Sequence, residues 1–137
     1  MDLKKITPIV LTFNEEANID RCLASLAWAE EILVVDSFST DGTLARLARY
    51  PRVQVEQRAF DSFAGQWNFA LASKKVKTPW VLTLDADYVM PEELVTEIRA
   101  RELGTGTTSL EIGFIYCVYG TALSASLYPP LPALFAK

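Results

Sequence analysis

Apolar and polar positions alternate along the first hundred residues in a way that predicts strands and helices in turn. Short apolar or alternating runs predict strands at residues 6–13, 32–36, 53–57 and 80–85. Apolar residues at helical spacing predict helices near residues 19–26, 44–48, 63–71 and 91–102. This order of elements predicts an α/β fold with three layers, a mainly parallel central sheet and the shape of a Rossmann-like nucleotide-binding domain.

Turn and capping residues mark where several of these elements begin. We expect Asn18 to cap the first helix and Pro91 to take the first position of the last one. The polar segment 37–43 is predicted to be a turn in which Gly42, a residue that tolerates a left-handed conformation, shapes the loop that supports Asp36. One buried face is expected on the third helix, made of Phe63, Trp67, Ala70 and Leu71.

The pattern changes after residue 103. Residues 1–103 are predicted to form the nucleotide-binding domain, residues 104–111 a linker, and residues 112–137 an apolar remnant of a further region. Residues 112–136 contain no charged side chain and are long enough to span a membrane. Glycines and prolines interrupt the run and favour a surface that faces an acceptor or a membrane, or a β-rich remnant of a larger domain.

Composition narrows the classes of partner. The net charge of −4 argues against nonspecific binding to nucleic acid, whereas a bound metal would still allow an anionic nucleotide. The chain has no histidine, so a metal site must use carboxylates, which favours Mg²⁺ or Mn²⁺ over zinc. Cys22 and Cys117 form no Cys-x-x-Cys pattern, and we expect a reduced, cytoplasmic location with Cys22 packed in the core.

Two carboxylates separated by one residue, Asp85 and Asp87, follow the apolar run that begins at Trp80. In open α/β sheets, ligands bind beyond the carboxyl ends of the strands. Two oxygen ligands at such a position suit a divalent cation that also holds a phosphorylated substrate. A turn from strand to helix with capping carboxylates is the structural alternative.

Further polar residues are expected at the same edge of the sheet. Asp36 ends the second strand and could accept hydrogen bonds from a nucleobase imide or a ribose hydroxyl, or could cap the next helix. Asn14 and Glu15 follow the first strand and could orient the base or ribose, or could serve as turn and first-turn residues of the helix.

Several motifs, taken in order, resemble the inverting family 2 glycosyltransferases with the GT-A fold. Among these, the chain is similar to the bacterial enzymes that add sugars to the lipopolysaccharide core. The resemblance covers residues 6–100, and its motifs are residues 10–16, 32–43, 65–68 and 82–87.

The resemblance implies an Mg²⁺- or Mn²⁺-dependent transferase that moves a sugar from a nucleotide-diphosphate sugar to a saccharide or lipid-linked acceptor. This would take place in cell-envelope polysaccharide synthesis, in the cytoplasm or at the inner face of its membrane, with possible peripheral membrane contact. It implies that Asp36 recognises the base and that Asp85 and Asp87 are the metal-binding D-x-D motif. The implied donor-binding residues are Thr12, Asn14, Glu15, Asp36, Gly65, Asn68, Asp85, Ala86 and Asp87.

The chain departs from the family in three ways. Residues 131–135 lack the arginine that family members commonly carry between their Tyr-Pro and Leu-Phe elements. Trp67 stands where the family usually has an arginine that contacts phosphate, and no catalytic base can be assigned after Asp87. An inverting transferase needs such a carboxylate to deprotonate the acceptor hydroxyl. The chain therefore looks like the donor-binding half of a transferase, and a catalytically silent, truncated nucleotide-sugar-binding fragment is the alternative. A phosphatase of the haloacid dehalogenase type is disfavoured because its D-x-D follows the first strand.

Overall fold

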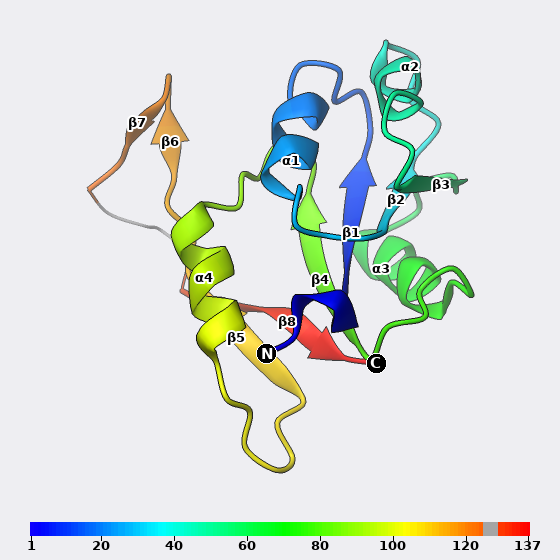
Figure 1. The fold of residues 1–137 in the computed structure, drawn as a ribbon. Coiled ribbons are helices and arrows are strands. Elements are labelled where there is room, and N and C mark those ends of the chain that lie inside the picture. Colours follow the sequence, from blue (N-terminus) through cyan, green and yellow to red (C-terminus); the bar gives the residue numbers. More distant parts are fainter. Residues whose placement is uncertain (125–128) are drawn as a thin grey trace.

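A six-stranded sheet forms the centre of the computed structural model, which describes residues 1–124 and 129–137. Its strand order is β3-β2-β1-β4-β8-β5 (Figure 1). Neighbouring strands are parallel from β3 to β4, whereas β8 runs antiparallel to both β4 and β5. The strands are β1 (Ile6–Thr12), β2 (Ile32–Asp36), β3 (Val53–Gln57), β4 (Trp80–Asp85), β5 (Ser109–Ile112) and β8 (Leu131–Ala136).

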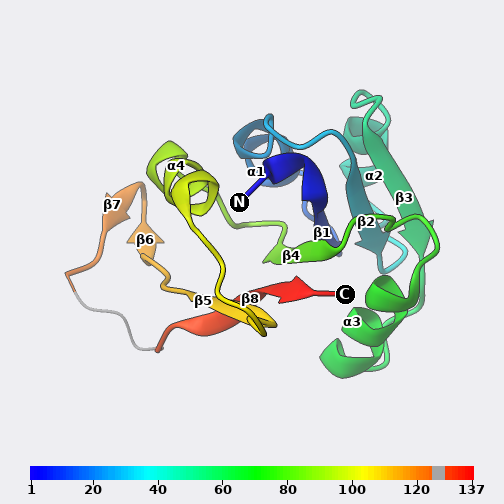
Figure 2. The same ribbon diagram turned by 60° about the horizontal axis from the view of Figure 1, so that its bottom comes forward.

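Helices cover both faces of this sheet, which confirms the predicted α/β fold (Figure 2). One face packs against α1 (Ile19–Ser25), α2 (Thr43–Leu47) and α4 (Glu92–Ala100), and the other against α3 (Phe63–Ala72). A short 3₁₀ helix, η1 (Leu3–Lys5), precedes β1. The central strands are buried on both sides, as expected of parallel strands between two helical layers.

The C-terminal region is not a separate piece from the sheet. The expected linker, residues 104–111, runs into strand β5, and the expected apolar remnant, residues 112–137, includes strand β8. Leu134 of β8 is fully buried, with Leu82 of β4 and Leu110 of β5 as its neighbours across the sheet. The apolar character of this region is therefore explained partly by burial in the main core.

A small two-stranded ribbon of β6 (Cys117–Val118) and β7 (Thr121–Ala122) lies apart from the central sheet (Figure 1). Residues 125–128 of the predicted apolar region lie outside the described part of the chain. Within the described residues, no helix has the length and apolar character needed to cross a membrane.

Three local expectations need correction. Asn18 stands at the N-cap of α1, but its side chain bonds to Glu15 and Arg21 instead of the helix backbone. Pro91 is the N-cap of α4, so the helix begins one residue later than predicted. Phe63 is 65% exposed although it follows the helical apolar spacing, and its ring packs against the exposed ring of Phe60.

Candidate functional site

A cleft of about 590 Å³ opens where the carboxyl ends of β1 and β4 meet. The chain continues from β1 to β2 on one side of this point, and β4 lies on the other, so the strand order reverses here. Such a switch point is the usual ligand-binding position in open α/β sheets. The lining residues are Leu11, Thr12, Phe13, Glu15, Ser37, Phe60, Phe63, Gln66, Asp85, Ala86 and Asp87.

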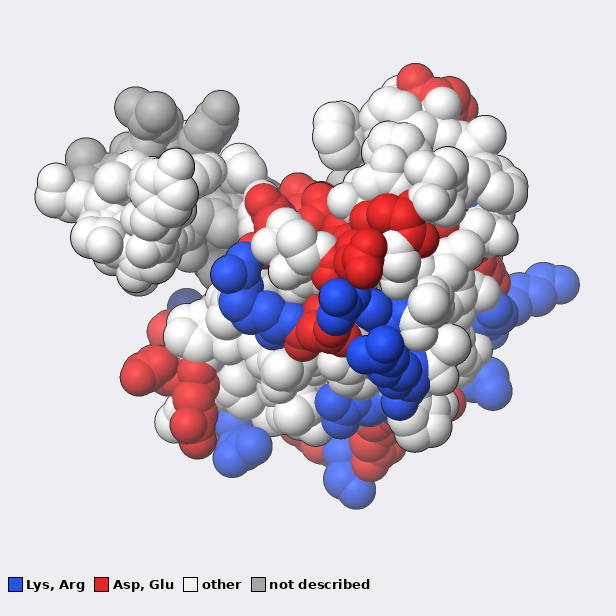
Figure 3. Space-filling model, turned by 90° about the horizontal axis from the view of Figure 1, so that it is seen from above, with Lys and Arg blue, Asp and Glu red and all other residues white. Residues whose placement is uncertain are grey.

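Carboxylates gather on the β4 side of the cleft. Seen from above, acidic side chains gather near the middle of this face of the molecule (Figure 3). Glu15 and Asp85 are half-buried there, whereas Asp87 is exposed. Burial raises the pKa of Asp85 above its ordinary value, the charge of Asp87 raises it further, and a hydrogen bond from Tyr88 opposes both effects. A cation at this position would offset the repulsion between the acids.

The acid pair suits Mg²⁺ or Mn²⁺ on the chemistry of its donor atoms. These ions take oxygen ligands and are commonly held by one or two carboxylates, with water and substrate phosphates completing the coordination. Among residues 1–124 and 129–137, no cluster of three or more His, Cys, Asp or Glu side chains forms a complete protein cage. Asp85 and Asp87 therefore fit a cation that is shared with a phosphorylated ligand.

Asp36 lies behind the cleft wall and is fully buried. Its carboxylate accepts hydrogen bonds from Thr12 Oγ1 at 3.0 Å, from Gln57 Nε2 at 3.0 Å, and from both the backbone N–H and the hydroxyl of Ser39. The resemblance implies a base-recognising role for this residue. A direct contact with a ligand would require the carboxylate to exchange one of these partners.

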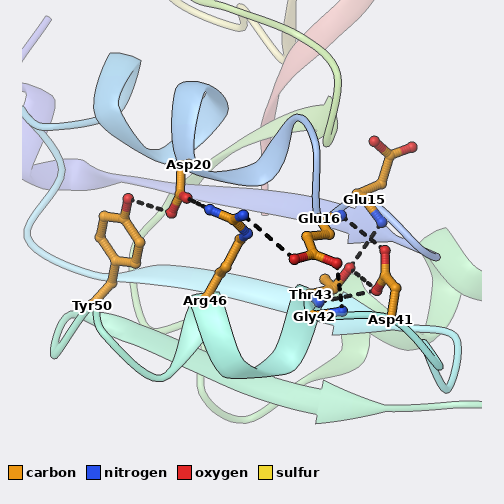
Figure 4. Close-up of polar contacts among 8 residues, drawn as sticks. All are labelled: Glu15, Glu16, Asp20, Asp41, Gly42, Thr43, Arg46 and Tyr50. Carbon is orange, nitrogen blue, oxygen red and sulfur yellow. Dashed lines mark hydrogen bonds and ion pairs between the residues drawn. The ribbon is translucent and has the colours of Figure 1, made fainter.

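The loops that follow β1 and β2 hold each other in place (Figure 4). The backbone N–H of Glu15 donates to Thr43 Oγ1 at 2.8 Å, and that of Glu16 donates to Asp41 Oδ2 at 3.0 Å. In return, the backbone N–H of Gly42 donates to the Glu16 carboxylate at 3.0 Å. These bonds fix the backbone of Glu15, whose side chain lines the cleft.

A row of charged side chains extends this contact between α1 and α2. Arg46 of α2 pairs with Glu16 at 3.4 Å and with Asp20 of α1, whose other oxygen accepts a hydrogen bond from the Tyr50 hydroxyl. The hydroxyl of Tyr50 and the guanidinium of Arg46 together lower the pKa of Asp20.

Gly42 shapes this loop without adopting a left-handed conformation. Its φ is −74°, which any residue adopts, and the left-handed residues in these loops are instead Asn14 and Phe38. A Cβ atom on Gly42 would lie 2.5 Å from the carboxyl group of Glu16. A side chain at this position would therefore have to displace the Glu16 carboxylate from its contact with the backbone N–H of residue 42.

The remaining predicted residues do not line the cleft. Asn14 uses its side-chain oxygen to accept from the backbone N–H of Thr40. Gly65 and Asn68 both lie on α3, where Gly65 faces the Asp61 carboxylate and Asn68 is exposed. Of the nine predicted donor-binding residues, the cleft brings together Thr12, Glu15, Asp85, Ala86 and Asp87.

Sequence reasoning did not assign the aromatic and amide residues of the opposite side. Phe60 and Phe63 meet edge to face with their ring centres 5.3 Å apart, and both are more than half exposed. Gln66 is buried beside them and contacts Ser37 and Arg58. Gln66 stands within the motif at residues 65–68, so the motif indicated the segment without indicating this residue.

Comparison with known proteins agrees with this geometry. The family model for glycosyl transferase family 2 matches residues 7–124. The lipopolysaccharide core biosynthesis glycosyltransferase LpsC of Rhizobium meliloti is 33% identical over 102 residues, which are 69% of this chain and 37% of that protein. An uncharacterized glycosyltransferase of Rickettsia bellii is 38% identical over 70% of this chain and 32% of its own length.

Solved structures show the same likeness. Residues 1–349 of S. aureus TarS align with a TM-score of 0.59 and 26% identity, over 78% of this chain and 41% of that one. The TarS complex with UDP aligns with a TM-score of 0.56 and 30% identity, over 69% of this chain and 31% of that one. The chain thus spans about a third of the length of the curated relatives that it matches. Because the family model covers most of its residues, the chain belongs to glycosyl transferase family 2.

Proposed function

We propose that the cleft binds a nucleotide-sugar donor, and that the chain is the donor-binding part of a transferase acting on a saccharide or lipid-linked acceptor in cell-envelope polysaccharide synthesis. The position of paired carboxylates at the switch point of the sheet carries this proposal. The UDP bound to TarS and the lipopolysaccharide core activity named for LpsC support it. The reaction would then take place on the cytoplasmic side of the membrane.

Asp85 and Asp87 are the proposed ligands of Mg²⁺ or Mn²⁺. A bound cation would neutralise the charge that develops on the departing nucleoside diphosphate. The exposed Asp87 is suited to direct contact with the ion, and the half-buried Asp85 to a contact through water or ribose. Glu15 lies within the same charged end of the cleft and is held by its backbone, so it can orient the ribose or the metal-bound water.

Donor binding without transfer is the second candidate function. The acids that line the cleft are Glu15, Asp85 and Asp87, and all three are assigned to the donor and its cation. Among the described residues that line the cleft, no acid is then left to deprotonate an acceptor hydroxyl, which favours the silent alternative.

The ribbon of β6 and β7 is the proposed contact with the acceptor lipid or the membrane surface. Ile115, Val118 and Leu123 are each about half exposed or more, and the segment carries no charge. Exposed apolar groups of this kind can enter the boundary between lipid headgroups and acyl chains.

Calorimetric titration with UDP and with GDP in MnCl₂, and again in EDTA, tests the donor site. We expect tighter binding with manganese, and a loss of about tenfold or more in Asp87→Asn. Glu97→Gln, which removes a charge from the exposed surface of α4, is the matched control and should bind as the unchanged protein does. Equal affinity with manganese and with EDTA would refute the proposed site. Turnover of UDP-sugars above that of Asp87→Asn would refute the silent alternative.

A further inference from the structure

We propose that Ser25 and Tyr88 hold the turn between β4 and α4 in one geometry, so that its two acids select Mg²⁺ over Ca²⁺. This rests on the proposed function, because it assumes that Asp85 and Asp87 bind a cation together with a nucleoside diphosphate. The residues that line the cleft include neither Ser25 nor Tyr88. Both are therefore positioning residues, which act on the cation through the side chains that contact it.

A tight turn directly after β4 carries the two acids. The backbone N–H of Tyr88 donates to the carbonyl of Asp85 at 3.1 Å, which closes a β-turn over residues 85–88. Ala86, which lies between the acids, is only 2% exposed, so the turn rests against the core at this point. The backbone of the turn therefore sets the separation of the Asp85 and Asp87 carboxylates.

Ser25, the last residue of α1, ties the segment after the acids to the helix. Its hydroxyl donates to the Cys22 carbonyl at 2.7 Å and accepts from the backbone N–H of Met90 at 3.0 Å. The single hydroxyl proton is thus used within α1, and the oxygen lone pairs are used by the loop. Met90 is only 5% exposed, so removal of the hydroxyl would leave its N–H without this partner in the core, which is costly.

The helix that provides this tie is itself held firmly on the sheet. Ile19 and Leu23 on its inner face are fully buried in the main core. The thiol of Cys22 lies 4.0 Å from the carbonyl of Asp85, at the start of the turn. Helix α1 therefore contacts the acid-bearing segment at both ends, at Asp85 and at Met90. A segment held in this way against a close-packed core has little freedom to change the spacing of its side chains.

Tyr88 holds the carboxylate of Asp85 from the other side. Its hydroxyl donates a hydrogen bond to that carboxylate. Its ring packs against the ring of Phe114, with the ring centres 5.2 Å apart, which restricts where the hydroxyl can lie. Because part of the Asp85 carboxylate is engaged by Tyr88, Asp85 cannot readily offer both oxygens to one cation.

These two constraints disfavour the larger cation. Mg²⁺ demands near-ideal octahedral coordination with oxygens at about 2.1 Å, whereas Ca²⁺ takes about six to eight oxygens at about 2.3–2.6 Å, often with a bidentate carboxylate. To bind Ca²⁺ equally well, the turn would have to open and Asp85 would have to offer both oxygens. The bond from Met90 to Ser25 opposes the first change, and the Tyr88 hydroxyl opposes the second.

Calorimetric titration of UDP in MgCl₂ and in CaCl₂ measures this selectivity as the ratio of the two dissociation constants. We expect the unchanged protein to bind UDP at least about tenfold more tightly in MgCl₂. Ser25→Ala and Tyr88→Phe should each lower this preference by about tenfold, which is a usual effect of losing a residue that supports a metal ligand. Ser25→Thr retains a hydroxyl and should keep the preference.

Ser73→Ala is the matched control. Ser73 also stands at the end of a helix, and its hydroxyl donates to Glu56 and accepts from the backbone N–H of Lys75, but it does not line the cleft. Its loss should lower the free energy of unfolding and leave the ratio of dissociation constants unchanged. A role of Ser25 in stability alone would give the same result as this control.

Equal affinity for UDP in MgCl₂ and CaCl₂, or an unchanged ratio in either variant verified as folded by circular dichroism, would overturn the proposal. Tyr88→Phe keeps the ring that packs on Phe114, so it provides this test even if Ser25→Ala does not fold. These outcomes leave the donor site standing. Equal affinity for UDP in MgCl₂, in MnCl₂ and in EDTA would instead refute the proposed function, and the inference with it.

Discussion

Replacing Leu134 by alanine tests whether the C-terminal strand belongs to the folded core. Leu134 is fully buried between Leu82 of β4 and Leu110 of β5. Its truncation removes three carbon atoms, which costs about 2.4 kcal/mol of transfer free energy at about 0.8 kcal/mol per group. The cavity that remains adds to this, so the free energy of unfolding should fall by about 3–4 kcal/mol.

Urea denaturation followed by circular dichroism measures this loss. The expected change is a large share of the roughly 5–15 kcal/mol that stabilises a typical domain, and it should lower the midpoint at an unchanged slope. Leu131→Ala is the matched control, because the same side chain at the start of the same strand is 47% exposed; about half the transfer free energy, roughly 1.3 kcal/mol, should be lost, with no buried cavity to add to it. A loss below about 1 kcal/mol in Leu134→Ala would show that β8 does not complete the sheet.

Two further predictions follow from the titrating groups. Asp20→Asn should destabilise the protein at neutral pH, because the pKa of Asp20 is lowered in the folded state. The contribution of this carboxylate to the free energy of unfolding is present above its ordinary pKa of 3.8 and is lost as the pH falls through the lowered pKa. Unfolding midpoints of both proteins between neutral and acid pH measure this, and a difference that grows on acidification would contradict it. Burial raises the pKa of Cys22 to about 12, whereas Cys117 is exposed. Iodoacetamide at pH 8 should therefore label Cys117 alone in the folded protein and both thiols in urea, as read by mass spectrometry, and labelling of folded Cys22 would refute the buried core position.

The parallel half of the sheet could be predicted from the sequence because its signals are local. Each strand from β1 to β4 is a short apolar or alternating run, and each crossover carries a helix with apolar spacing. The pairing of β8 with β4 has no such signal, because it joins Leu134 to Leu82 across a long stretch of chain. An antiparallel strand that inserts beside a parallel one is specified by the whole core and not by its own pattern.

Only part of the candidate site could likewise be predicted from the sequence. The sequence predicts that Asp85 and Asp87 lie together at a strand end, because strand ends and carboxylates are both visible in a sequence, and both residues line the cleft. The carboxylate of Asp36 accepts four hydrogen bonds, and these depend on residues from three strands and a loop. Such a network brings together distant parts of the chain, so it cannot be predicted from the sequence pattern. Helical spacing places Phe63 on the apolar face of α3, but spacing alone does not reveal that this side chain lines an open cleft.

The reciprocal hydrogen bonds between the loops after β1 and β2 make each loop depend on the sequence of the other. Glu16 accepts from Gly42, Asp41 accepts from the backbone of Glu16, and Thr43 accepts from the backbone of Glu15. In a chimaera that takes one loop from a homologue and keeps the other, these donors and acceptors would lose their hydrogen-bond partners. Engineering of donor preference in this fold should therefore exchange both loops together.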